Sequence, residues 1–393
     1  MAYKRLKFRF SAVFSVFIKL NYNKQRFVVT CKMSHLPYSP PRWLRNGLAI
    51  TLYTALRASR DWEATLQDPE PPYQEKIFTG AGGVPIFGIV AIPDNPRGTI
   101  VGTYGITGSL DNQWFLKLLG RKAFAKGYAV VLFDWRAHGK TAVLSPTLTS
   151  DGLYEGEDFV CIAAEAMAMG CPAPFWFTGF SLGGQLALWG VKAAGEKLST
   201  REHLFSGRLV PHFPLTTEDI AGAAVICPSL DSNRSLSYLV KHPVGKYLEQ
   251  AIARALKKLA WRLYNIHPDA IDPAAIERAN SIAGFDRELV IERLGFPSVE
   301  AYYHASSALG ILPHLNKPTL IIYAEDDPLF DPTLVPDLKA ASASNPYIDL
   351  MLTRYGGHVG YISSKANQRQ IGDTDPWWAW NRILEWCDRF ATS

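Results

Sequence analysis

The sequence predicts an α/β protein: a mainly parallel sheet with helices on both faces, interrupted by a helical cap. Past residue 75, short runs rich in Val, Ile and Phe alternate with segments of helical periodicity, the pattern of a sheet built from strand and helix units. From residue 228 to residue 318 the helical periodicity continues without a strand, which indicates an inserted cap. Right-handed crossovers would then place helices on both faces of the sheet.

The strands are expected in this order along the chain. Residues 75–79 and 85–92 form a hairpin around Gly80, Gly82 and Gly83. Buried or half-buried strands follow at 98–103, 128–134, 175–178, 223–227, 319–323 and 348–353. Helices are expected at 156–169 and 184–194, on either side of the strand at 175–178. We therefore assign residues 75–230 and 317–393 to one core and residues 231–316 to the cap.

The cap contains an amphipathic segment. One apolar stripe at helical spacing consists of Leu248, Ile252, Leu256, Leu259 and Leu263. The remaining positions are crowded with Arg254, Lys257, Lys258 and Arg262. Such a helix either packs on the core with a solvated basic face or docks on anionic lipid.

The charge distribution argues against a nucleic-acid-binding body. The chain has 393 residues, 48% of them hydrophobic, with 41 Lys and Arg against 36 Asp and Glu. The basic excess lies in residues 1–32, which contain no Asp or Glu. The basic residues of this segment are Lys4, Arg5, Lys7, Arg9, Lys19, Lys24, Arg26 and Lys32. The rest of the chain is therefore weakly acidic, whereas nucleic-acid binding needs basic residues concentrated on the folded surface.

The first 74 residues divide into a basic leader and an amphipathic helix. Residues 1–32 fit a disordered or mis-assigned start, a targeting segment or a membrane-surface tether. Residues 33–74 contain an apolar helical face from Trp43 to Leu56, expected to pack on the core or to lie at a membrane interface. The five cysteines form no CxxC pair, so neither a disulfide framework nor a zinc site is expected. The sequence has no run of about 18 consecutive apolar residues, so a membrane span is not expected.

The strongest chemical motif is the run from Gly179 to Gly184, which reads Gly-Phe-Ser-Leu-Gly-Gly. It follows the expected strand at 175–178 and precedes a helix, the context that G-x-S-x-G requires. Glycines remove side chains that would clash at the sharp turn, so the hydroxyl of Ser181 stands at the carboxyl end of the sheet. We predict Ser181 as a nucleophile.

A serine nucleophile needs a base and an acid that orients the base, in the chain order Ser, acid, His. His358 fits the last place, in a glycine-rich loop after the final strand. Its chief rival, His138, suits a structural turn better. The acid follows the strand at 319–323, and the residues alone leave Asp326 and Asp327 open. A metal-binding role for the acidic cluster of Glu325, Asp326, Asp327 and Asp331 is disfavoured, because these residues lack the spacing of a calcium loop.

Two glycine-rich segments are rejected as nucleotide sites. A phosphate loop at Gly139 would need a glycine where the chain has Asp134. A dinucleotide fingerprint at Gly80 would need a glycine where the chain has Pro85.

These motifs together resemble the α/β-hydrolase superfamily and, within it, the YheT-like group that includes the mammalian ABHD lipases. The resemblance covers most of residues 75–390. It depends on the serine motif at 179–184, on the run GFPSVEAYYHASSALGILPHLNKPTLIIYAEDDP at 295–328 and on GGHVGYI at 356–362.

The resemblance implies an α/β-hydrolase fold and favours Asp327 over Asp326 as the acid. It also implies that the backbone N–H groups of Ile106 and Leu182 form an oxyanion hole. The family usually has His-Gly where this chain has Tyr104 and Gly105, and often Asn where it has Gln185.

The expected function is a serine hydrolase acting on carboxylic esters, with lipid-like acyl esters favoured by the resemblance and by the apolar cap. No cofactor, metal or nucleic acid is expected. The protein is expected in the cytoplasm, with peripheral membrane contact through the N-terminal segment or the cap. Two alternatives stay open: an acyltransferase with the same catalytic residues, and a catalytically silent scaffold of this fold.

Overall fold

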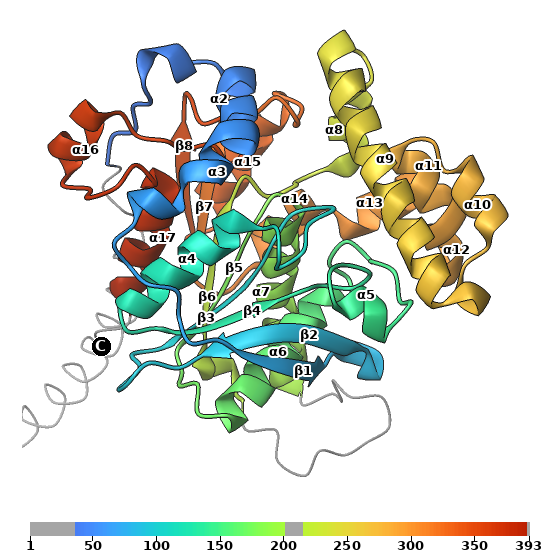
Figure 1. The fold of residues 1–393 in the computed structure, drawn as a ribbon, viewed down its shortest axis with the longest axis horizontal. Coiled ribbons are helices and arrows are strands. Elements are labelled where there is room, and N and C mark those ends of the chain that lie inside the picture. The colour runs from blue at the N-terminus through green and yellow to red at the C-terminus, as the bar shows by residue number, and fades with distance from the viewer. Residues whose placement is uncertain (1–35, 201–214, 391–393) are drawn as a thin grey trace, which may run out of the picture.

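A computed structural model describes residues 36–200 and 215–390, so the basic residues of the leader lie outside the described part of the chain. The described strands form one eight-stranded sheet in the order β1-β2-β4-β3-β5-β6-β7-β8 (Figure 1). Their bounds are β1 Gln74–Thr79, β2 Pro85–Ala91, β3 Thr99–Thr103, β4 Ala129–Phe133, β5 Phe175–Phe180, β6 Ile220–Ile226, β7 Thr319–Ala324 and β8 Ile348–Thr353. The pairs β1/β2 and β2/β4 are antiparallel, and the other pairs are parallel. The predicted fold class is confirmed.

Helices cover both faces of the sheet because neighbouring strand residues point to opposite sides. In β5, the Trp176 ring packs on Trp386 of α17 (Trp378–Asp388), with ring centroids 5.2 Å apart. The next residue, Phe177, packs on Phe159 of α6 (Glu155–Ala168) at 5.0 Å. Helix α7 (Leu182–Thr200) packs on α6, and α4 (Trp114–Ala125) contacts β4. Shorter helices complete the core: α5 Thr141–Leu144, α14 Ala308–Ile311, α15 Leu334–Ser344 and α16 Lys365–Ile371.

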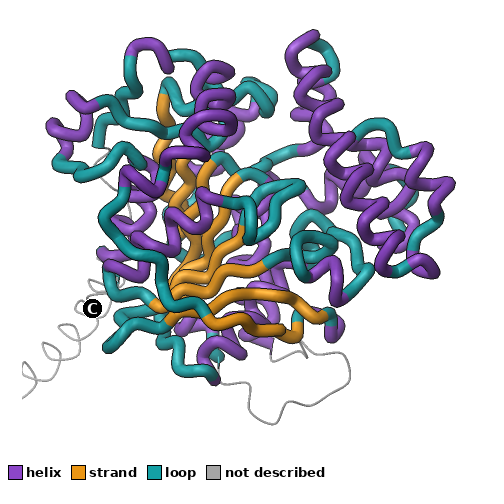
Figure 2. The backbone as a smooth tube through the Cα atoms, in the orientation of Figure 1, coloured by secondary structure: helices purple, strands orange, loops and turns teal. Residues whose placement is uncertain are grey.

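The cap lies beside the sheet as a separate group of helices between β6 and β7 (Figures 1 and 2). It comprises α8 Ser232–Leu239, α9 Pro243–Ile266, α10 Pro273–Arg278, α11 Ile282–Phe285, the π-helical turn η7 Asp286–Val290, α12 Ile291–Leu294 and α13 Val299–Ser306. Leu256 and Leu263 of the predicted stripe are buried in a hydrophobic cluster that belongs mainly to the cap. Arg254, Lys258 and Arg262 are exposed on the other side of α9.

The N-terminal helix differs from the prediction. It begins at Gly47, not near Trp43, because the Asn46 side chain caps α2 (Gly47–Tyr53) by accepting a 3.0 Å hydrogen bond from Ala49 N. It then widens into the π-helical turn Thr54–Ala58 and ends in α3 (Ser59–Asp61). None of the helices in the described part of the chain is long and apolar enough to cross a membrane.

The start of β6 was also predicted too late. The strand begins at Ile220, before the Ala-Gly pair that carries little strand propensity. Gly222 has a φ of 148°, and the register with β5 shifts nearby. This glycine bulge interrupts the strand pattern, so the sequence does not indicate the first residues of β6.

Candidate active site

Ser181 occupies the single residue between the end of β5 and the start of α7. Its φ of 56° lies in the left-handed region. A residue other than glycine adopts this strained conformation mainly where the surrounding structure holds it. Those surroundings are tight: a Cβ added to Gly179 would lie 2.2 Å from Gly183 O, and one added to Gly183 would lie 2.4 Å from Tyr104 O. The flanking glycines are therefore sterically required for this turn.

Asp327 and His358 meet beyond the ends of β7 and β8. Asp327 Oδ2 and His358 Nδ1 are 2.8 Å apart, and Asp327 Oδ1 accepts a 2.9 Å hydrogen bond from Leu329 N. The Asp327 side chain is 2% exposed and the His358 side chain 12%. The His358 ring also packs on the Phe330 ring in a T-shaped arrangement, with centroids 5.1 Å apart. The contact with Asp327 leaves Nε2 as the ring nitrogen that is free to act.

Asp326 has a different partner. Its Oδ1 accepts a 2.8 Å hydrogen bond from Gly357 N, so it holds the backbone of the loop that carries His358. Its Oδ2 is buried without a hydrogen-bond partner among the described residues, and burial raises the pKa of this carboxyl group. The geometry therefore brings Asp327 to the imidazole ring and assigns Asp326 to the loop.

The loop after β3 passes directly over Ser181. A Cβ added to Gly105 would lie 3.0 Å from Ser181 Cβ and 3.3 Å from Ser181 Oγ. Ile106 and Leu182 line the same pocket as Ser181. In the described residues, neither of their backbone N–H groups donates to a protein acceptor. No hydrogen bond joins Ser181 Oγ to His358 in the described structure; such contacts often tighten only when substrate binds.

A comparison with known families bears on this arrangement. The model of the alpha/beta hydrolase family matches residues 105–367, more than half of the chain. The chain belongs to the alpha/beta hydrolase family.

Relatives of this hydrolase include the Synechocystis sp. protein named "Putative esterase slr0264", which is 53% identical over 90% of this chain and 94% of its own. "Putative esterase YheT" of Escherichia coli is 30% identical over 42% of this chain and 46% of its own. Mouse "Phospholipase ABHD3" is 26% identical over 68% of this chain and 59% of its own. The solved Pyrococcus furiosus esterase Pf2001 has 16% identity and a TM-score of 0.48, covering 90% of this chain and 98% of that one. The resemblance inferred from the motifs is confirmed.

In this hydrolase, Tyr104 anchors the loop over the serine. Its hydroxyl donates to Asp134 Oδ1 at 2.5 Å, at the end of β4. The same carboxylate accepts hydrogen bonds from Leu110 N at 2.8 Å and from Lys140 N at 2.7 Å. Tyr104 is fully buried, so its departure from the family's usual residue corresponds to an internal support of the loop.

His138 also contacts the loop after β3. Its Nδ1 lies 2.9 Å from Arg136 O, and its Nε2 accepts a 3.1 Å hydrogen bond from Thr107 N. These contacts make Nδ1 the protonated nitrogen. Burial lowers the pKa of His138 to about 4, and its ring stacks on Trp135. His138 is thus a neutral structural residue, as its position in the sequence suggested.

Thr51 is a residue of the site that the sequence did not indicate. Its Oγ1 accepts a 2.8 Å hydrogen bond from His358 N and donates to Gly47 O at 2.6 Å. A Cβ added to Gly47 would lie 1.6 Å from Asp326 O. Helix α2 therefore packs directly against both loops that carry the acid and the histidine.

The pocket beside Ser181 lies between core and cap. Its walls are mostly apolar, with Ile106 and Leu148 from the core and Leu236, Ile252, Leu256 and Phe285 from the cap. Its polar members include Asp151, Asp286 and Tyr303. In the part of the chain that the structure describes, no group of His, Cys, Asp or Glu side chains is arranged to hold a metal ion.

Proposed function

We propose that this protein is a serine hydrolase that cleaves carboxylic esters through Ser181, His358 and Asp327. The observation that carries the proposal is the 2.8 Å contact between Asp327 and His358, at the same end of the sheet as the strained turn of Ser181. The names of the relatives, which include esterases and a phospholipase, support the same reaction class.

In this mechanism, Ser181 Oγ attacks the ester carbonyl while His358 Nε2 takes the hydroxyl proton. Asp327 keeps the proton of His358 on Nδ1 and stabilises the imidazolium that forms. The N–H groups of Ile106 and Leu182 stabilise the tetrahedral oxyanion, assisted by the amino end of α7. His358 then gives its proton to the leaving alcohol, and a water activated by the same imidazole releases the acid from Ser181.

Lipid-like acyl esters are the proposed substrates. The support is the apolar lining contributed by Leu236, Ile252 and Leu256, which would shield an acyl chain from water. An acyl chain gains about 0.8 kcal/mol for each buried CH₂ group, so longer chains should bind more tightly until the pocket is full.

The test is hydrolysis of p-nitrophenyl esters from acetate to palmitate by the wild-type chain, Ser181→Ala and His358→Ala. We expect turnover by the wild type, with a rise in kcat/KM from acetate to longer chains, and loss of turnover in both variants. Added alcohol that diverts the acyl group from water would indicate an acyltransferase. Failure of the wild type on every ester would contradict the proposal and favour a silent scaffold.

A further inference from the structure

Two buried carboxylic acids line the pocket, and ester hydrolysis uses neither of them. Asp151 comes from the core, in the loop before α6, and is 7% exposed. Asp286 comes from the cap, at the start of η7, and is 6% exposed. The two acids approach the pocket of Ser181 from different parts of the molecule. Their burial calls for an explanation, because unpaired buried carboxylates are costly.

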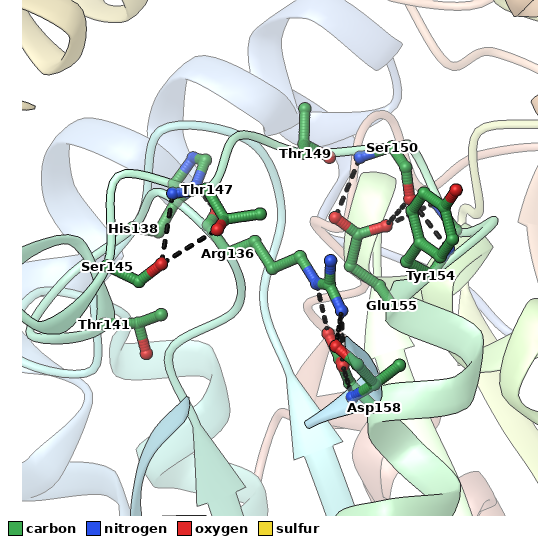
Figure 3. Close-up of polar contacts among 12 residues, drawn as sticks. Arg136, His138, Thr141, Ser145, Thr147, Thr149, Ser150, Tyr154, Glu155 and Asp158 are labelled. Atoms are coloured by element: carbon green, nitrogen blue, oxygen red, sulfur yellow. Dashed lines mark hydrogen bonds and ion pairs between the residues drawn. The ribbon is translucent and has the colours of Figure 1, made fainter. Parts of the chain in front are cut away.

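The loop that carries Asp151 is rigidly held. Glu155 accepts a 2.9 Å hydrogen bond from Ser150 N (Figure 3). It also accepts a 3.0 Å hydrogen bond from Gly152 N, so both neighbours of Asp151 are held. Asp151 itself has a φ of 49°, and its carbonyl oxygen accepts a 2.7 Å hydrogen bond from Gln185 Nε2. A left-handed backbone at a residue that is not glycine often marks a functional position. The loop therefore fixes the Asp151 side chain at the pocket.

Few protein groups satisfy the two carboxyl groups. In the described structure, the Asp151 carboxyl group accepts a long 3.3 Å hydrogen bond from Thr149 Oγ1, and the buried Tyr302 hydroxyl, which meets no other partner there, lies near enough to lower its pKa. Asp286 accepts from the Tyr303 hydroxyl. Ser235, which also lines the pocket and is 4% exposed, has a hydroxyl group without a partner among the described residues. Hydrogen-bonding capacity therefore remains unused around these acids.

No basic side chain of the pocket neutralises the pair. The described lining residues include no Lys or Arg, and burial keeps the lining His138 neutral, with a pKa lowered to about 4. The nearby Arg136 is paired with Asp158 at 2.8 Å (Figure 3). Burial raises the pKa of Asp286 to about 7, and burial together with the charge of Asp286 raises the pKa of Asp151. Asp286 therefore ionises at about pH 7, and no Lys or Arg among the described lining residues compensates the charge that it then carries.

We propose that Asp151 and Asp286 form a subsite for an ammonium group, so that the substrate is an ester carrying a protonated amine beside its apolar chain. That the bound ester is a substrate rests on the proposed function. The binding of an ammonium group at the subsite does not depend on it. An alkylammonium ion would supply two features that the described lining lacks: a positive charge to pair with the carboxyl groups, and N–H donors for their unused acceptors.

The test compares n-octylammonium with 1-octanol, which share the alkyl chain and differ in the charged donor. Binding of each to the full chain is measured by calorimetry at about pH 8, where the amine is protonated. We expect octylammonium to bind at least about tenfold more tightly than octanol. The double variant Asp151→Asn with Asp286→Asn should lose most of that preference. Asparagine tolerates the left-handed backbone at position 151.

Glu249→Gln is the matched control. Glu249 is a buried cap carboxylate, 6% exposed, which accepts from Ile282 N at 2.7 Å and does not line the pocket. It should keep the ammonium preference. An absence of preference in the wild type would overturn the subsite, as would an equal loss in the control and the double variant. The wild-type comparison keeps the test valid even if the double variant fails to fold.

A kinetic arm separates the subsite from the proposed function. p-Nitrophenyl 6-aminohexanoate and heptanoate have the same chain length, and the wild type should prefer the amino ester about tenfold in kcat/KM. Tight octylammonium binding without hydrolysis of either ester would overturn the proposed function and support the subsite. Hydrolysis of both esters at equal rates, without ammonium preference in binding, would overturn the subsite and support the hydrolase.

Discussion

The neighbouring acids Asp326 and Asp327 provide a sharp test of the site geometry, because the same substitution should lower kcat by very different amounts at the two positions. Asp327→Asn removes the negative charge 2.8 Å from His358 Nδ1. Asp326→Asn removes a charge whose contact is with the backbone N–H of Gly357. Asparagine is nearly the same size as aspartate, so packing changes little in either variant.

The magnitude follows from the charge that develops on His358. An imidazolium about 4 Å from a carboxylate gains about 4 kcal/mol at an effective dielectric constant of 20. Each 1.36 kcal/mol corresponds to about a tenfold change in rate, so losing this term costs about three orders of magnitude in kcat. The loss of tautomer control adds to this cost. For Asp326→Asn we expect less than about a tenfold loss, because the amide oxygen still accepts from Gly357 N.

The assay is kcat and KM for p-nitrophenyl butyrate, with thermal melting of each variant to confirm folding. We expect the loss in Asp327→Asn to fall on kcat, with KM little changed. If Asp326→Asn were as inactive as Asp327→Asn while remaining folded, the assignment of the two acids would be wrong.

Three further predictions follow from the contacts around the site. Thr51→Val should lower kcat about tenfold by leaving His358 N without its acceptor, and Thr51→Ser should restore it; equal activity in both would show that α2 does not position the histidine. Tyr104→Phe should lower the free energy of unfolding in urea by about 1–3 kcal/mol, because Asp134 loses a buried donor; an unchanged midpoint would contradict this. Because the pKa of Asp286 is raised from 3.8 to about 7, the folded state holds this proton more tightly, so the stability contributed by the protonated group declines as pH rises from about 4 to about 7. Asp286→Asn should flatten that decline in urea titrations, and a decline that persists unchanged would refute this role.

Local sequence rules predicted the serine turn because its requirements lie within a few residues. Gly179 and Gly183 are needed to avoid clashes within the turn itself, and the strand before it and the helix after it are visible in the periodicity. The candidate histidine and acid were predicted from their positions after expected strands, whose carboxyl ends the parallel sheet brings to one edge.

The remaining features depend on distant contacts. The residues alone could not separate Asp326 from Asp327, because only the course of the loop at Gly357 decides which carboxylate meets the ring. Thr51 lies 307 residues from His358 along the chain, so no local pattern joins them. Asp151 and Asp286 come from core and cap, and their shared pocket emerges only when the two pack together.

The most direct test of the central claim is covalent labelling by a fluorophosphonate, followed by mass spectrometry of the modified peptide. This reagent reacts with a serine only when a base activates the hydroxyl group. We predict labelling of the wild type at Ser181, with labelling abolished in Ser181→Ala and strongly reduced in His358→Ala. Labelling at another residue, or undiminished labelling in Ser181→Ala, would contradict the account.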